Sequence, residues 1–132
     1  MSRTDSPSGS RILVVDDNAE SAFVLAEILR HEGHTVETAG NGEQAVRTGP
    51  MFDPRVILLD LGMPGMDGLA TARRIRQQRW GQDVILVAVT GRGLPEDRLR
   101  TEAAGFNAHL VKPVDGKELL RVIEDLLSRL SA

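Results

Sequence analysis

Short apolar runs alternate with longer amphipathic stretches along most of this chain. Three of the runs are almost wholly apolar, a pattern typical of strands buried on both faces of a parallel sheet. The predicted strands are residues 12–15, 35–38, 56–59, 84–89 and 108–111.

The stretches between the strands carry the signals of helix starts and stops. Residues 18–32 place four apolar side chains on one face, and the last stretch of the chain does the same. The third helix is expected to run from Asp67 to about Arg79. The predicted N-caps are Asn41, Asp67 and Asp115, Pro95 suits a first helical turn, and Gly33 and Gly105 are predicted stops.

Five repeats of strand and helix predict an α/β fold. Because crossovers between parallel strands are right-handed, we expect an open, doubly wound five-stranded parallel sheet with helices on both faces. The 132 residues suit a single domain, which we place at residues 11–130. The Ser-rich residues 1–10 are predicted to be a flexible tail.

Composition excludes several classes of protein. A formal net charge of −3 gives no electrostatic footprint for nucleic acid. The absence of cysteine excludes disulfides and thiolate metal sites. The longest clearly apolar run, residues 84–89, is too short to span a membrane. Because the start of the chain has no secretory signal, we expect a cytoplasmic protein.

Polar residues follow four of the predicted strands, at the point where each strand ends. In open parallel sheets, ligands bind outside the carboxyl ends of the strands, so these residues are expected to meet at one edge. The strand ends carry Asp16 with Asp17, then Asp60, Thr90, and Lys112 with Pro113.

These residue types favour phosphoryl chemistry. Crowded carboxylates repel one another unless a cation joins them, and oxygen ligands with room for water suit Mg²⁺. The ammonium of Lys112 can balance phosphate charge, and the hydroxyl of Thr90 can donate to a phosphoryl oxygen. Asp60, at the end of an apolar strand, is therefore the candidate nucleophile that would form an aspartyl-phosphate.

The strand-end residues, in this order and spacing, resemble the signature of two-component response-regulator receiver domains. The stretch 59–68, Leu-Asp-Leu-Gly-Met-Pro-Gly-Met-Asp-Gly, is similar to the phosphorylation-site loop of that family. The resemblance covers residues 11–130 and implies a flavodoxin-like (βα)₅ fold with strand order 2-1-3-4-5. It is strongest toward single-domain receivers and those of hybrid histidine kinases.

The resemblance also implies a role for each site residue. Asp60 would be the phosphoacceptor, and the Mg²⁺ ligands would be Asp60, Asp17, the backbone carbonyl of Gly62, and Asp16 directly or through water. Lys112 would contact the phosphoryl group and, before transfer, Asp60.

Signalling in the family runs through a switch pair. Thr90 would be the switch hydroxyl, and the Lys112–Pro113 bond would be cis. The second switch position is usually Tyr or Phe, whereas this chain has His109, for which a surface imidazole without a switch role is an equal alternative.

The implied protein is a signalling receiver rather than a conventional enzyme. Its expected partners are a sensor histidine kinase or phosphotransfer protein, and either a downstream protein or covalently attached kinase domains.

Two other classes fit the sequence less well. A magnesium-dependent phosphatase with an aspartate nucleophile needs a second aspartate two residues later, where this chain has Gly62. A nucleotide-binding protein needs a glycine-rich loop after the first strand, where Asp16 and Asp17 would repel phosphates in the absence of a metal.

Overall fold

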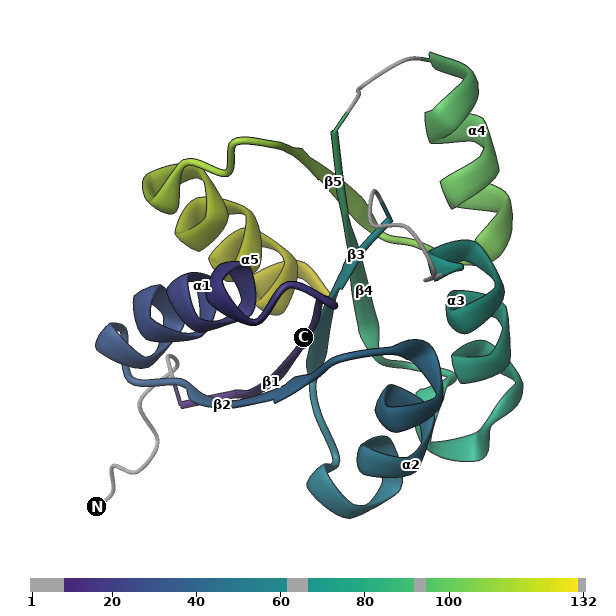
Figure 1. Cartoon of the computed structure of the whole chain (residues 1–132), viewed down its shortest axis with the longest axis horizontal. Coiled ribbons are helices and arrows are strands. Elements are labelled where there is room, and N and C mark those ends of the chain that lie inside the picture. The colour runs from purple at the N-terminus through teal and green to yellow at the C-terminus, as the bar shows by residue number, and fades with distance from the viewer. Residues whose placement is uncertain (1–8, 62–66, 92–94, 131–132) are drawn as a thin grey trace.

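Five parallel strands form one sheet in a computed structural model that describes residues 9–61, 67–91 and 95–130. The order β2-β1-β3-β4-β5 confirms the predicted doubly wound topology (Figure 1). Each strand lies within one residue of its predicted bounds. The strands are β1 (Arg11–Val15), β2 (Thr35–Ala39), β3 (Val56–Asp60), β4 (Ile85–Thr90) and β5 (Ala108–Val111).

Helices cover both faces of this sheet. In Figure 1, α1 and α5 lie on one face, and α2, α3 and α4 lie on the other. No helix in the described ranges is long and apolar enough to cross a membrane. The helices are α1 (Ala19–His31), α2 (Gly42–Phe52), α3 (Gly68–Gln77), α4 (Pro95–Ala104) and α5 (Gly116–Leu130), with a 3₁₀ turn η2 (Arg79–Gly81).

The helix ends follow the predicted capping residues. The side chains of Asn41 and Asp67 each accept a hydrogen bond from a backbone N–H three residues on. Gly33 and Gly105 both have positive φ, which glycine adopts without strain. One end differs from the prediction, since α3 stops two residues short of Arg79. Its C-cap residue takes an extended conformation, and the η2 turn follows.

Two apolar cores lie on either side of the sheet, and β3 contributes to both. Val56 and Leu58 pack in the core beneath α1 and α5, whereas Ile57 and Leu59 pack in the core beneath α2, α3 and α4. All five residues of β3 are buried, as the unbroken apolar run predicts. The strand is therefore fixed from both faces up to its last residue, Asp60.

The sole tryptophan packs at the opposite end of the sheet from Asp60. A Cβ atom on Gly49 of α2 would come within 2.1 Å of the ring of Trp80, so only glycine fits beneath the indole. The ring also borders a hollow of about 370 Å³ at the amino-terminal ends of the strands, together with Arg11 and Asp53.

Candidate functional site

Asp60 and Lys112 form the centre of the candidate site. Asp60 ends β3 and is only 2% exposed, and its Oδ2 lies 2.6 Å from Nζ of Lys112. The lysine reaches this position because its backbone N–H donates to the carbonyl of Thr90, which extends the pairing of β5 with β4. The Lys112–Pro113 peptide bond is cis, as the resemblance implies. Two residues 52 positions apart are thus joined by a part-buried ion pair.

Asp16 places a second buried carboxylate beside this pair. It is 3% exposed, its backbone N–H donates to the carbonyl of Ala39, and its Oδ1 accepts from the N–H of Asn18 at 2.9 Å. Burial raises the pKa of Asp16, and the nearby charge of Asp60 raises it further, while the Asn18 N–H and the ammonium of Lys112 oppose the rise. A nearby cation would stabilise the ionised form of this carboxylate, which burial and the charge of Asp60 disfavour.

The predicted magnesium ligands are only partly brought together. Asp16 and Asp60 are buried side by side, and Asp17 is exposed at the rim. Gly62, whose carbonyl was the other predicted ligand, lies outside the described residues. Within the described ranges, no three acidic or histidine side chains converge as a ready-made metal cage. Oxygen-only donors with room for water nevertheless fit Mg²⁺, which commonly takes one or two carboxylates and keeps several waters.

The two predicted switch residues lie on neighbouring strands. Thr90 is buried at the end of β4, which pairs directly with β3, the strand that Asp60 ends. His109 is half-buried on β5, and its Nε2 makes a hydrogen bond with Oγ1 of Thr101 on α4. Sequence reasoning singled out His109 but not Thr101, because a threonine inside a helix carries no sequence signal for such a contact.

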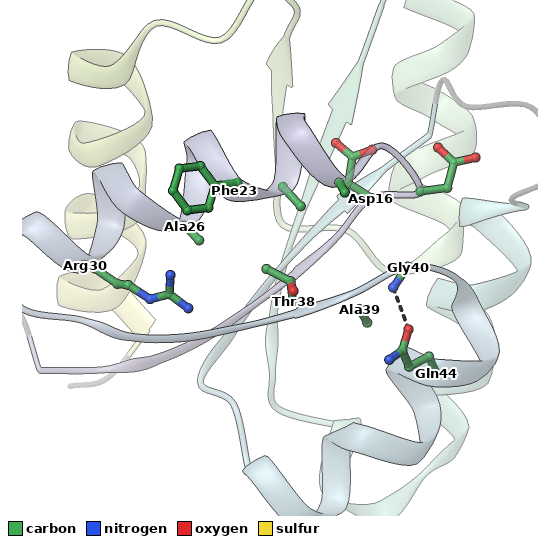
Figure 2. A pocket seen from close by; sticks show the side chains of 11 residues that line it. Asp16, Phe23, Ala26, Arg30, Thr38, Ala39, Gly40 and Gln44 are labelled. Atoms are coloured by element: carbon green, nitrogen blue, oxygen red, sulfur yellow. Dashed lines mark hydrogen bonds between the residues drawn. The ribbon is translucent and has the colours of Figure 1, made fainter.

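Two hollows flank the site, and the sequence pattern predicted neither. One, of about 550 Å³, runs from Asp16 and Lys112 along the exposed side chain of Val24 on α1. The other, of about 460 Å³, lies between α1 and the end of β2. Figure 2 shows Phe23 and Arg30 of α1 on one side of it and Gln44 on the other. Both hollows depend on the orientation in which α1 packs on the sheet. The periodicity of apolar residues along the sequence does not specify that orientation.

Comparison with known proteins agrees with this geometry. The family model of the response regulator receiver domain matches residues 12–124. The transcriptional regulatory protein TcrA of Mycobacterium tuberculosis is 37% identical over 122 residues, which are 92% of this chain. Protein PilH of Pseudomonas aeruginosa is 31% identical over 119 residues, 90% of this chain and 98% of PilH. The chain spans only 47% of the length of TcrA.

A solved structure extends the likeness to three dimensions. The receiver domain of the sensor histidine kinase PA1611 of Pseudomonas aeruginosa is 35% identical, with a TM-score of 0.82 over 91% of this chain and 98% of that one. That structure is described with a magnesium ion coordinated in its active-site cleft. The matches are to receivers, and none of those described here is a phosphatase. On this fold, this strand-end geometry and these relatives, the chain belongs to the response regulator receiver domain family of two-component signalling.

Proposed function

We propose that Asp60 is the phosphoacceptor of this receiver, within a functional unit that spans residues 11–130. The observation that carries the proposal is the ion pair at 2.6 Å between the buried carboxylate of Asp60 and Lys112, with the buried carboxylate of Asp16 beside it. In the proposed step, an oxygen of Asp60 attacks the phosphorus of a phosphohistidine. The O–P bond forms while the N–P bond breaks, and the departing imidazole takes up a proton.

The residues around Asp60 supply charge balance for this transfer. Lys112 holds the carboxylate in place through Oδ2 and can then neutralise an oxygen of the incoming phosphoryl group. Asp16 and Asp17, with the carbonyl of Gly62, would hold Mg²⁺, which supplies further charge neutralisation and orientation of the phosphoryl oxygens. Thr90, at the end of the adjacent strand, is the proposed hydroxyl donor to the bound phosphoryl group.

The proposed phosphodonor is a sensor histidine kinase or a phosphotransfer protein. The hollow beside Asp16 and Lys112 continues onto α1, where Val24 is exposed. An apolar surface that leads into the site suits a protein donor, which must place its phosphohistidine within reach of Asp60. The match to nearly all of PilH favours a receiver that acts alone. The match to about half of TcrA favours a receiver within a longer regulator.

The first prediction concerns the site of phosphorylation. Wild-type protein incubated with Mg²⁺ and acetyl phosphate should gain one base-labile phosphoryl group by intact mass, and Asp60→Asn should gain none. Asp67→Asn is the matched control, because Asn also caps the helix that Asp67 begins, and it should behave as wild type. If acetyl phosphate does not phosphorylate the wild-type protein, a phosphorylated phosphotransfer protein is used as the donor in its place. A phosphoryl group retained by Asp60→Asn would contradict the assignment.

A further inference from the structure

Strand β2 lies at the edge of the sheet and, among the described residues, pairs only with β1. The N–H of Thr35 donates to the carbonyl of Ser10, just before β1. Successive residues of a parallel strand direct their backbone groups to opposite sides, so every second residue from Thr35 onward bonds to β1. The N–H and C=O groups of Val36 and Thr38 therefore point away from the sheet.

Two side chains cover parts of this outer edge. Nη2 of Arg30 donates to the carbonyl of Val36 at 2.8 Å, and Oε1 of Gln44 accepts from the N–H of Gly40 at 2.7 Å. Figure 2 shows Thr38 between these two contacts. Within the described part of the chain, no hydrogen bond covers the outward N–H and C=O of Thr38. The edge is thus closed at both ends and open in the middle.

The hollow of about 460 Å³ between α1 and β2 opens beside this gap, and Thr38 helps to line it. Val36 belongs to the core beneath α1 and α5, so the side chain of Thr38, two residues on, faces the same side of the sheet. The buried Ala22 and Ala26 also line the hollow, and the ring of Phe23 beside them is 61% exposed. An open strand edge with an apolar hollow next to it suits an added strand, which bonds through its backbone and places a side chain in the hollow.

The charges around this edge favour a basic partner. Glu37 is exposed on β2, and the exposed Asp17 lines the hollow. Arg30, the basic residue of the lining, already pairs with Glu27 at 3.0 Å. A second copy of this chain, paired through the same edge, would bring the Glu37 carboxylates of both copies together, and like charges across paired strands are destabilising. A segment with an apolar residue opposite Thr38 and basic residues on either side of it would meet both the hollow and Glu37.

We propose that the outer edge of β2 is a docking site for an extended basic segment of a partner protein, which joins the sheet as a sixth strand. The backbone of the segment bonds to the N–H and C=O of Thr38. One apolar side chain enters the hollow beside Phe23, and its basic neighbours lie near Glu37. The proposal does not require phosphorylation of Asp60, so it stands or falls independently of the proposed function.

An NMR titration with an acetylated and amidated pentapeptide of alternating lysine and valine tests the site. In the free protein, the outward amides of Val36 and Thr38 should exchange faster than those of Thr35 and Glu37, which bond to β1. The peptide should shift the signals of β2 and of Phe23, and it should slow exchange at Thr38. No shift at all, shifts confined to other elements, or unchanged exchange at Thr38 in the saturated protein would overturn the proposal.

Thr38→Pro removes the outward N–H, and proline is tolerated at an edge position whose N–H faces solvent. The Kd of the peptide should rise about five-fold, the factor expected for one lost hydrogen bond. Thr38→Ala keeps the N–H and should bind as wild type does. Equal binding by the proline and alanine variants would refute backbone pairing. If urea unfolding shows that Thr38→Pro does not fold, a peptide methylated at its backbone nitrogens decides instead, and its binding to wild type as tightly as the unmethylated peptide would refute the pairing.

Two further measurements identify the occupant. A pentapeptide of alternating glutamate and valine should bind wild type more weakly than the lysine peptide does, and Glu37→Lys should reverse this order. The same order in both proteins would overturn the assignment of a basic partner. Sedimentation velocity of the protein alone should show a monomer. A wild-type dimer that Thr38→Ala retains and Thr38→Pro or Glu37→Lys changes would make a second copy the occupant and overturn the proposal.

Discussion

His34 is a buried imidazole whose surroundings favour the neutral form. Its Nδ1 accepts a hydrogen bond from the backbone N–H of Ser10 at 3.3 Å. Its Nε2 lies 3.8 Å from a carboxylate oxygen of Glu124 and has no hydrogen-bond partner among the described residues. Burial lowers the pKa of His34 below its usual value of 6.5, and the charge of Glu124 offsets the lowering in part.

This lowered pKa makes stability depend on pH. Below about pH 6.5 the unfolded chain takes up a proton at this position before the folded protein does, so acidification favours unfolding. The free energy of unfolding should fall by at most about 1.4 kcal/mol per pH unit from this residue, until the folded-state pKa is passed. Denaturant unfolding at a series of pH values measures the slope.

His34→Asn isolates the effect, because the amide oxygen can still accept from Ser10 but does not titrate. The difference between the wild-type and variant profiles should be constant above pH 7 and should change as the pH falls below 6.5. His31→Asn, at an exposed position, should leave the wild-type slope unchanged. Parallel profiles for wild type and His34→Asn would refute this account.

At the scale of single residues, the sequence predicted the chemistry better than the supporting contacts. Asp60 and Lys112 could be assigned because strand ends of a parallel sheet meet at one edge, a rule that needs no side-chain detail. The contacts of Thr101 and His34 could not be predicted, because they depend on how α4 and α5 pack against the sheet. The predicted carbonyl ligand, Gly62, stays a prediction because it lies outside the described residues.

Among the elements, Arg76 joins the end of α3 to two neighbouring connections. Its guanidinium donates to the carbonyls of Gly81 and Val84 before β4, and to the carbonyl of Gly105 after α4. It also donates to the side chain of Asn107, whose amide oxygen in turn accepts from the backbone N–H of Leu86 in β4. One side chain thus fixes the C-terminal end of α4, which lies away from the phosphoacceptor edge.

Replacing this arginine should cost more than a surface change. Arg76→Met leaves several carbonyls without donors, and we expect the free energy of unfolding to drop by about 2–4 kcal/mol. Arg73→Met, at an exposed position of the same helix, should stay within about 0.5 kcal/mol of wild type. Urea unfolding compares the three proteins. Equal stabilities would show that the network of Arg76 is replaced by water at little cost.

The elements themselves were largely predictable. Apolar runs located β1, β3 and β4 within one residue, since burial on both faces leaves little choice of side chain. The end of α3 was placed two residues too late, because no glycine or proline marks it and the extended Gln78 is set by the turn that follows. The order of the strands came from the family resemblance, since periodicity alone does not order a sheet.

For the whole molecule, metal binding should appear as added stability. A ligand that binds only the folded state at one hundred times its dissociation constant adds about 2.7 kcal/mol to the free energy of unfolding. We expect Mg²⁺ to produce a rise of this kind in wild type, and a chelator to reverse it. The rise should be lost in Asp17→Asn, while its metal-free stability stays within about 0.5 kcal/mol of wild type because Asp17 is exposed.

Glu20→Gln is the matched control for this titration, since Glu20 is an exposed acid in the first turn of α1 and was not predicted as a ligand. It should keep the full response to Mg²⁺. The same Mg²⁺ response in Asp17→Asn as in wild type would remove Asp17 from the metal site. Thermal unfolding at several Mg²⁺ concentrations distinguishes these results.

The packing of Trp80 against Gly49 determines what the intrinsic fluorescence of this protein reports. The only indole sits at the amino-terminal ends of the strands, whereas Asp60 ends β3 at the opposite edge. Its emission will follow the detachment of α2 from the sheet, and so will follow unfolding. It will carry little information about events at the phosphoacceptor edge. Optical studies of signalling in this receiver therefore need a chromophore introduced near α4.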